Sequence, residues 1–167
     1  MTMPAQDKII EVAKYFIKRS QDEFKTDPSR KLDALKLQKL LYYAKAWNLV
    51  LNKGERLFSD EFQAWVHGPA NPKVWHHFQG FDFSVAHPEI AKERFEHITA
   101  KEKEVLDIVW HSYGKFDGKY LEMLTHAEEP WLTARRGLNQ KDISQNIISD
   151  ESMKGYYERR FKETART

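Results

Sequence analysis

The stretch that decides the fold is Asp33-Ala-Leu-Lys-Leu-Gln-Lys-Leu-Leu-Tyr-Tyr-Ala-Lys-Ala-Trp-Asn-Leu-Val-Leu-Asn52. Its apolar residues recur at steps of three and four, which predicts one amphipathic helix. The predicted core stripe consists of Leu37, Leu40, Leu41, Ala44 and Trp47. Further apolar side chains cover much of the remaining circumference, so we expect this helix to be buried at the centre of the domain. Asp33 is the expected N-cap and Gly54 the expected C-terminal glycine.

Helices are also predicted on both sides of this stretch, from apolar periodicity and capping residues. The signals lie at Ile9–Ile17, Asn71-Pro72, Thr99–Glu102, Asp117, Glu129-Pro130 and Ser149 or Asp150. These signals predict six or seven helices around the buried central helix, hence a mainly α, compact multi-helix single domain over residues 1–167. No separate DNA-binding module is predicted.

One short segment has the alternation of a strand. Phe62, Ala64 and Val66 are apolar at every second position, and residues 55–58 are the nearest candidate partner. We therefore expect at most one small two-stranded β-ribbon near residues 55–66, ended by His67-Gly68-Pro69. Residues 80–96 are expected to form a loop with a helical turn.

Composition excludes several classes of protein. The 167 residues include 5 Trp, 7 Tyr and 10 Phe, enough large apolar side chains to build a core and exclude disorder. The net charge of +2 gives no overall attraction to nucleic acid. The chain has no cysteine, which excludes disulfides, thiol catalysis and zinc fingers. No apolar run is long enough to span a membrane and no signal peptide is recognisable, so a cytoplasmic protein is expected.

No motif predicts catalysis, a metal or another cofactor. Neither Gly-x-Ser-x-Gly, nor a glycine-rich phosphate loop, nor His-Glu-x-x-His is present. His76 and His77 are adjacent and diverge on a helix, so they are poor joint ligands. Three carboxylate–histidine pairs have helical i, i+4 spacing, which is more typical of ordinary ion pairs than of metal sites. These pairs are Glu93/His97, Asp107/His111 and Glu122/His126.

Aromatic residues next to turns are the best candidates for binding a partner. Trp65, Trp75 and Trp131 each lie beside a proline, glycine or histidine, and tryptophan is a preferred anchor of protein interfaces. The predicted partner-binding residues are Trp65, His67, Pro69, Trp75, His126 and Trp131. They form one patch if residues 64–74 and 126–131 lie side by side. The alternative interpretation is that the same rings fill gaps between short helices.

Separated strings in this sequence resemble one known family. In the front half they are Leu37–Ala44, Leu57-Phe58, Ala64-Trp65, Gly68-Pro69 and Pro72–Val74. In the back half they are Val105–Gly114, Leu121, Leu124–His126 and Pro130-Trp131. Over roughly residues 8–161 the chain is similar to the Panacea domain, the SocA-like domain also known as phage-associated protein. Ala70, which stands where valine commonly follows Gly-Pro, and Asn71 depart from the family pattern.

The resemblance implies an antitoxin of a toxin–antitoxin pair, which binds a cognate toxin from a neighbouring gene without catalysis. An alternative within the same family is an adaptor that delivers its toxin to a ClpXP-type AAA+ protease. Two further alternatives are a metal-dependent enzyme that uses His126 and a nucleic-acid-binding regulator. The sequence does not select the toxin.

Overall fold

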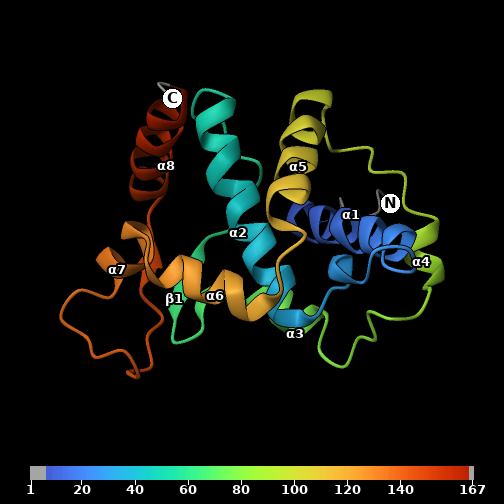
Figure 1. The fold of residues 1–167 in the computed structure, drawn as a ribbon, viewed down its shortest axis with the longest axis horizontal. Coiled ribbons are helices and arrows are strands. Elements are labelled where there is room, and N and C mark those ends of the chain that lie inside the picture. Colours follow the sequence, from blue (N-terminus) through green and yellow to red (C-terminus); the bar gives the residue numbers. More distant parts are fainter. Residues whose placement is uncertain (1–6, 166–167) are drawn as a thin grey trace, which may run out of the picture.

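The computed structural model describes residues 7–165, which form eight α-helices, one 3₁₀ turn and three short strands (Figure 1). The elements are α1 (Lys8–Glu23), the 3₁₀ turn η1 (Pro28–Arg30), α2 (Ala34–Leu51), β1 (Phe62–Trp65), β2 (Gly68–Ala70), α3 (Pro72–His77), α4 (Pro88–Ala91), α5 (Ala100–Tyr113), α6 (Gly118–His126), α7 (Glu129–Ala134), β3 (Ile147–Ile148) and α8 (Asp150–Ala165). The mainly α fold class is confirmed. No described helix is long and apolar enough to cross a membrane.

The helix α2 runs through the middle of the domain, as predicted (Figure 1). It packs against α1, α3, α5, α6, α8 and β2. The Asp33 carboxylate accepts a hydrogen bond of 2.8 Å from the backbone N–H of Lys36, which is the expected N-cap. Leu37, Leu40, Leu41 and Ala44 are fully buried, so four of the five predicted stripe residues form the core.

Trp47, the fifth predicted core residue, is only partly buried. Its indole N–H donates to the hydroxyl of Tyr113 at 2.9 Å, at the boundary between α2 and α5. The fully buried tryptophan is instead Trp110 in α5, whose ring stacks on Phe16 of α1. Trp47 therefore lies on the predicted face of the helix, but its side chain is less deeply buried than predicted.

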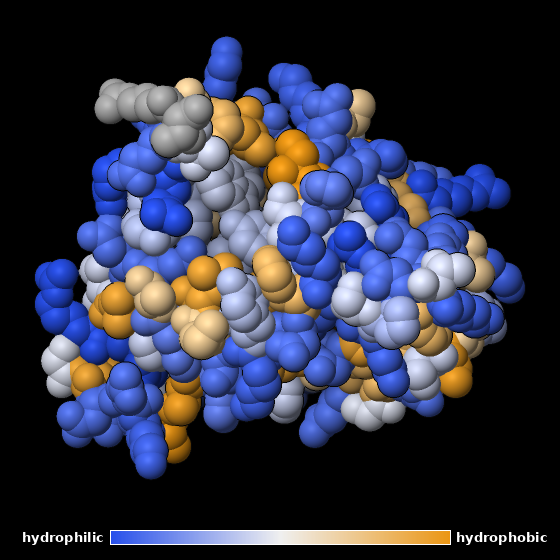
Figure 2. Space-filling model, viewed as in Figure 1, coloured by the Kyte–Doolittle hydropathy of each residue, from blue (hydrophilic) through white to orange (hydrophobic). Residues whose placement is uncertain are grey.

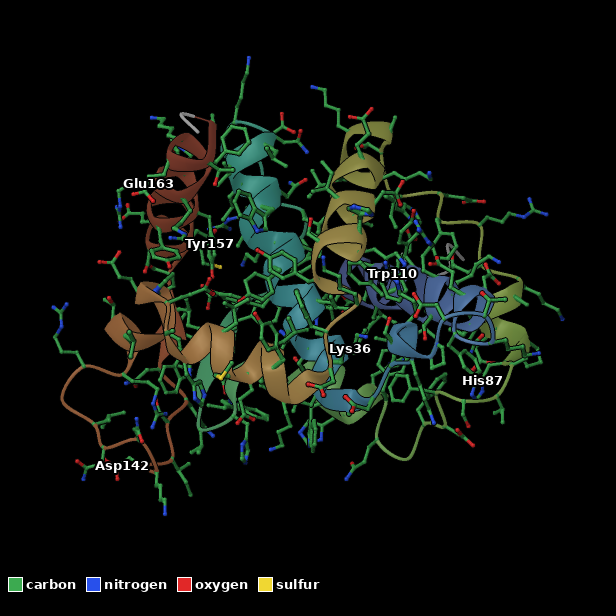
Figure 3. All side chains as sticks on the ribbon, viewed as in Figure 1. Lys36, His87, Trp110, Asp142, Tyr157 and Glu163 are labelled. Carbon is green, nitrogen blue, oxygen red and sulfur yellow. The ribbon has the colours of Figure 1, made fainter. Side chains whose placement is uncertain are left out.

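Three lysines of α2 are buried, although helical periodicity places lysine in solvent. They are Lys36, Lys39 and Lys45, and each ammonium donates to backbone carbonyl oxygens. Lys36, at the end of α2 near α6 (Figure 3), bonds the carbonyls of Ser29, Lys31 and Gly114. Burial lowers the pKa of Lys36 to about 8, and the charge of Arg30 acts in the same direction. These backbone bonds attach neighbouring segments, including β2, to the central helix, and Lys45 also pairs with the carboxylate of Asp150 at 3.2 Å.

The β-structure differs from the predicted ribbon. β1 pairs with β2 through a two-residue turn and with β3 on its other edge, giving an antiparallel sheet of order β2-β1-β3. The predicted partner, residues 55–58, forms no strand, and Gly68-Pro69 continues the sheet where a break was expected. Pro69 is tolerated because β2 is an edge strand. It lies opposite Ala64, whose own N–H points away from β2 and donates to Asn146.

Several of the predicted helix starts are confirmed by side-chain caps, whereas α7 begins at Glu129 without one. Asn71, Thr99 and Asp117 accept hydrogen bonds from the first turns of α3, α5 and α6, and Thr99 forms the expected capping box with Glu102. The helical turn expected within residues 80–96 is α4.

Candidate functional site

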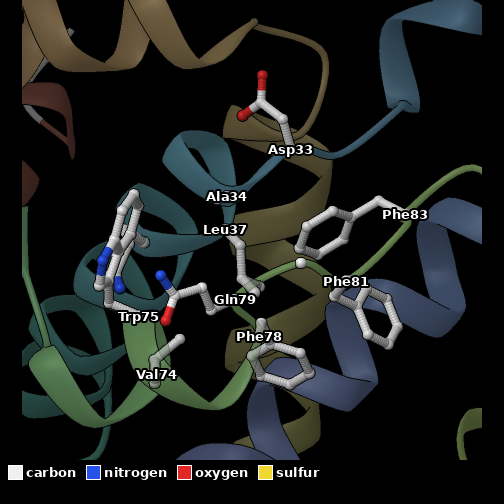
Figure 4. A pocket seen from close by; sticks show the side chains of 11 residues that line it. Asp33, Ala34, Leu37, Val74, Trp75, Phe78, Gln79, Phe81 and Phe83 are labelled. Carbon is white, nitrogen blue, oxygen red and sulfur yellow. The ribbon is translucent and has the colours of Figure 1, made fainter.

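A groove lies where α2 begins, between the β1–β2 hairpin, α3 and α6. It consists of two neighbouring cavities of about 480 and 400 Å³. The larger cavity is bounded by α2, the hairpin, Trp75 and α6. The smaller one, on the other side of Trp75, is lined mainly by apolar side chains, with Trp75 facing Phe81 and Phe83 across it (Figure 4). Asp33, Ala34, Gln38 and Trp75 line both cavities, so together they form one groove with two compartments.

Two of the three tryptophans predicted to bind a partner meet at this groove. The rings of Trp65 and Trp75 contact each other edge to face, with centroids 6.2 Å apart. Trp75 is 43% exposed, and the indole N–H of Trp65 donates to the side chain of Gln63 at 2.7 Å. Tryptophan is the residue type that most often anchors protein interfaces, and a side chain on a short, proline-initiated helix has little conformational entropy to lose on binding.

The rim of the larger cavity carries an imidazole–carboxylate pair. Nδ1 of the exposed His67 lies 3.0 Å from Oε1 of Glu122 in α6, and the ammonium of Lys119 is 3.8 Å from the same oxygen. Sequence spacing pairs Glu122 with His126 along α6. In the structure Glu122 turns to the hairpin instead, because the turn residue His67 lies over the same face of α6.

Lys39 lies against the larger cavity with its side chain under the hairpin. It is 1% exposed, and its Nζ donates to the carbonyl oxygen of Pro69 at 3.0 Å. Burial lowers its pKa to about 7, and the negative charge of Glu122 opposes this shift. Gly68 has a φ of +100°, and a Cβ there would lie 2.7 Å from Cε of Lys39. The glycine therefore lets the hairpin close over the lysine.

The end of the hairpin is fixed by an amide side chain of α2. Gln38 donates to the carbonyl of Asn71 at 3.0 Å and accepts from the N–H of Asn71 at 2.8 Å. The buried Gln38 therefore pairs with the backbone as a neighbouring strand would. The sequence does not indicate that Gln38 and Lys39 hold the hairpin. It shows only that they are polar residues in a helix that is apolar on almost every side.

His126 and Trp131 form a second layer behind the hairpin. Their rings stack with centroids 4.0 Å apart, and the indole N–H of Trp131 donates to the carbonyl of Trp65 at 2.8 Å. Trp131 is only 4% exposed, while burial lowers the pKa of the half-buried His126. The two predicted corners thus lie side by side. Trp65, His67 and Trp75 reach the surface, whereas Pro69 and Trp131 lie beneath it.

The i, i+4 carboxylate–histidine pairs do not form. His97 bonds Glu11 of α1 through Nδ1 at 2.9 Å, and Asp107 accepts from Tyr15 and Arg19. Residues 93–97 also lie outside any helix, so a spacing of four residues does not bring Glu93 and His97 onto one face. Within residues 7–165 no group of three or more His, Asp or Glu is arranged to hold a metal ion.

Exposed apolar side chains elsewhere are scattered. Figure 2 shows hydrophobic atoms over α6 and α7 interrupted by hydrophilic ones, and Met123 and Leu132 are exposed there. Isolated apolar side chains of this kind are usual on protein surfaces. The groove differs from them because it is concave, aromatic and supported by buried polar bonds.

A family model described as antitoxin SocA-like, Panacea domain, matches residues 37–132. The matched segment begins within α2 and ends within α7, so it includes the hairpin, α3 and α6 that enclose the groove. No curated protein and no solved structure is significantly similar to the chain.

Proposed function

The chain belongs to the antitoxin SocA-like Panacea domain family, and from this membership we propose that it neutralises a protein toxin by binding to it directly. The toxin is proposed to be the product of a neighbouring gene, and the site of action the cytoplasm. The proposed mode of action is stoichiometric binding without catalysis.

The structural observation that supports this proposal is the exposed Trp75 at the centre of the two-compartment groove. Interface energy concentrates in a few aromatic anchors within well-packed surroundings. Here the anchor lies between two cavities, and the hairpin beside it is fixed by Gln38, Lys39 and Trp131. A surface held in one conformation loses less entropy when a partner binds.

The test is co-expression of the chain with the product of each adjacent gene. We expect one product to arrest growth alone, to be harmless together with this chain, and to co-purify with it in a defined ratio. Rescue must persist in a host that lacks the ClpXP protease. Rescue that requires the protease would support the adaptor function instead, and the absence of any toxic adjacent product would contradict the proposal.

A further inference from the structure

We propose that the carboxylate of Glu128 and the rings of Tyr113 and Tyr156, where α5, α7 and α8 meet, bind a lysine or arginine side chain of the partner. These three residues are called the cation site below. The inference rests on the proposed function, because it specifies which chemistry of the toxin the domain recognises. The cation site is separate from the groove, since none of its residues lines either cavity.

Glu128 is a buried carboxylate without a cation. It is 9% exposed, and its Oε1 accepts hydrogen bonds from the hydroxyls of Tyr43 at 2.7 Å and Tyr157 at 2.9 Å. Although Glu128 precedes α7, its carboxylate does not cap that helix. Within residues 7–165 no ion pair of up to 4.0 Å includes Glu128, whereas its neighbour Glu129 pairs with Arg159.

The second carboxylate oxygen, Oε2, is open to an incoming group. Neither tyrosine bond uses it. Among the described residues, the buried polar side-chain atoms without a partner are Ser20 Oγ and His126 Nε2. Because Oε2 is not one of them, it reaches the surface. Figure 2 shows that surface hollowed above α6, between α8 and α5, with residues of intermediate hydropathy, the class of Tyr and Trp, in the hollow.

Two partly buried tyrosines lie beside this carboxylate. Tyr113 stacks on the buried Tyr43 with centroids 4.0 Å apart, so its other face points away from that ring. Tyr156 contacts Tyr157 edge to face at 4.9 Å. Burial raises the pKa of Tyr113 to about 12 and also raises that of Tyr156, and the charge of Glu128 adds to both shifts. Tyrosine faces next to a carboxylate attract a cation.

The protein's own nearby cation leaves the carboxylate uncompensated. Burial raises the pKa of Glu128, and Arg160 of α8 opposes this shift. The Arg160 side chain is 61% exposed, however, and lies 3.9 Å from Glu163. A buried carboxylate without a paired cation is costly, and a bound ammonium or guanidinium offsets that cost.

The surroundings favour a side chain of a polypeptide over a free amine. The half-exposed Phe161 contacts Trp47 at 6.4 Å, and the indole N–H of Trp47 donates to the Tyr113 hydroxyl at 2.9 Å. Aromatic surface therefore continues beyond the carboxylate. The apolar stem of a lysine or arginine and its neighbours in the chain can cover this surface.

The first experiment compares the peptide acetyl-Leu-Lys-Leu-amide with the same peptide carrying norleucine in place of lysine. Binding is followed by the NMR signal of the Trp47 indole N–H. We expect the lysine peptide to bind roughly tenfold more tightly. Equal affinities would overturn the inference, and so would equally tight binding of n-butylammonium, which would assign the site to a free amine.

Substitutions locate the preference. Glu128→Gln keeps an acceptor for both tyrosines and should abolish the preference for lysine, whereas Glu129→Gln, one residue away and exposed, should keep it. Full preference in folded Glu128→Gln contradicts the site. A second pair does not depend on that variant: Tyr156→Leu should weaken binding of the lysine peptide roughly threefold, and Tyr156→Phe should restore it. Equal binding by these two variants contradicts the role of the ring.

The pH dependence provides an independent readout. The groups facing Glu128 are Tyr42 and Tyr43 of α2, Tyr113 of α5, and Tyr156, Tyr157 and Arg160 of α8. None of them titrates between about pH 4 and 8. Affinity for the lysine peptide should rise as Glu128 ionises with increasing pH. His126 of α6 also titrates in this range, so Glu128→Gln is the control and should flatten the profile. A flat wild-type profile contradicts the inference.

The two proposals can fail separately. If the adjacent toxin binds wild type and folded Glu128→Gln within about threefold of each other, the antitoxin function stands and the cation site fails. If no adjacent product binds, the antitoxin function fails, and the peptides still report whether the site selects a cation. A wild-type dimer that Glu128→Gln dissociates would make a second copy the occupant and overturn the inference.

Discussion

The indole N–H of Trp131 donates a 2.8 Å hydrogen bond to the backbone carbonyl of Trp65, so a buried tryptophan positions a partly exposed one. The ring of Trp131 also stacks on His126 and lies beneath the guanidinium of Arg135, which itself bonds the carbonyl of Ala64. Two tryptophans that are equivalent in the sequence therefore have different places in the structure: Trp131 supports the hairpin from within, and Trp65 lies at the surface.

Substitution of Trp131 should act through stability. Trp131→Ala is expected to lower the free energy of unfolding by ~3–5 kcal/mol, because it removes a buried ring, and to reduce toxin rescue in proportion. Trp131→Phe, which removes the hydrogen bond but keeps a ring, should cost ~1–3 kcal/mol. Denaturant unfolding measures both, with the exposed neighbour Leu132→Ala as control. A Trp131→Ala protein of unchanged stability would contradict this assignment.

Substitution of Trp75 should act through binding. We expect Trp75→Ala to keep nearly the wild-type thermal midpoint, since the ring is half exposed, and to weaken toxin binding by ~2 kcal/mol or more. Ile108→Ala, which truncates an exposed residue of α5 outside the groove, is the matched control. Calorimetric titration measures the affinity of each variant for the toxin. Equal affinities of Trp75→Ala and Ile108→Ala would place the interface elsewhere.

Truncation of the central stripe should destabilise the whole domain. Leu40 and Leu41 have no exposed surface, so Leu40→Ala or Leu41→Ala is expected to cost ~2–5 kcal/mol by leaving a cavity. Chemical denaturation monitored by circular dichroism measures the loss. An unchanged midpoint in either variant would be incompatible with a buried α2.

Glu128 should make the domain less stable at neutral than at acidic pH. Burial raises its pKa, although it accepts hydrogen bonds from the hydroxyls of Tyr43 and Tyr157. The folded state then holds this proton to a higher pH than the unfolded state, so the contribution is full at low pH and is lost as pH rises through the folded pKa.

The variant Glu128→Gln removes this charge and keeps an oxygen acceptor for both tyrosines. We expect it to melt at a higher temperature than wild type at pH 7, with the difference shrinking towards pH 4. Thermal scans across this range provide the measurement, and a variant less stable than wild type at pH 7 would show that the carboxylate is required.

Lys39 should have the opposite pH dependence. Unfolded lysine binds its proton up to its usual pKa of 10.5, whereas folded Lys39 loses it near 7. Between these values the unfolded state binds more protons, so stability rises with pH, by up to about 1.4 kcal/mol per unit. The free energy of unfolding of wild type, minus that of Lys39→Met, should therefore increase from pH 7 to pH 9 when both are measured by urea unfolding. A constant difference would mean that Lys39 remains charged throughout.

The fold could be predicted where the signal is local. Asp33, Asn71, Thr99 and Asp117 each cap the helix that follows within three residues, and the stripe of α2 repeats within a few turns. The sheet could not be predicted in this way. Phe62 pairs with Ile148, a partner far along the chain, and β2 contains a proline that is acceptable only at an edge.

The candidate site could be predicted in part for the same reason. Trp65, His67 and Trp75 stand out because aromatic residues beside turns are exposed in many folds. The floor of the groove could not be found, because Lys39 is buried only by a hairpin that packs on α2 from elsewhere in the sequence. Glu122 likewise meets His67 only once α6 is docked beneath the turn.

Besides the buried side chains of Phe62 and Ala64, the hairpin is held by hydrogen bonds to its main chain. Lys39, Trp131 and Arg135 bond the carbonyls of Pro69, Trp65 and Ala64, groups that any residue at those positions would offer. Of these positions and the turn, only Gly68 is constrained by its own conformation. The outward side chains at 63 and 65 bond only each other, so their exchange leaves these main-chain bonds in place, and the hairpin is a scaffold on which surface side chains can be varied by library selection.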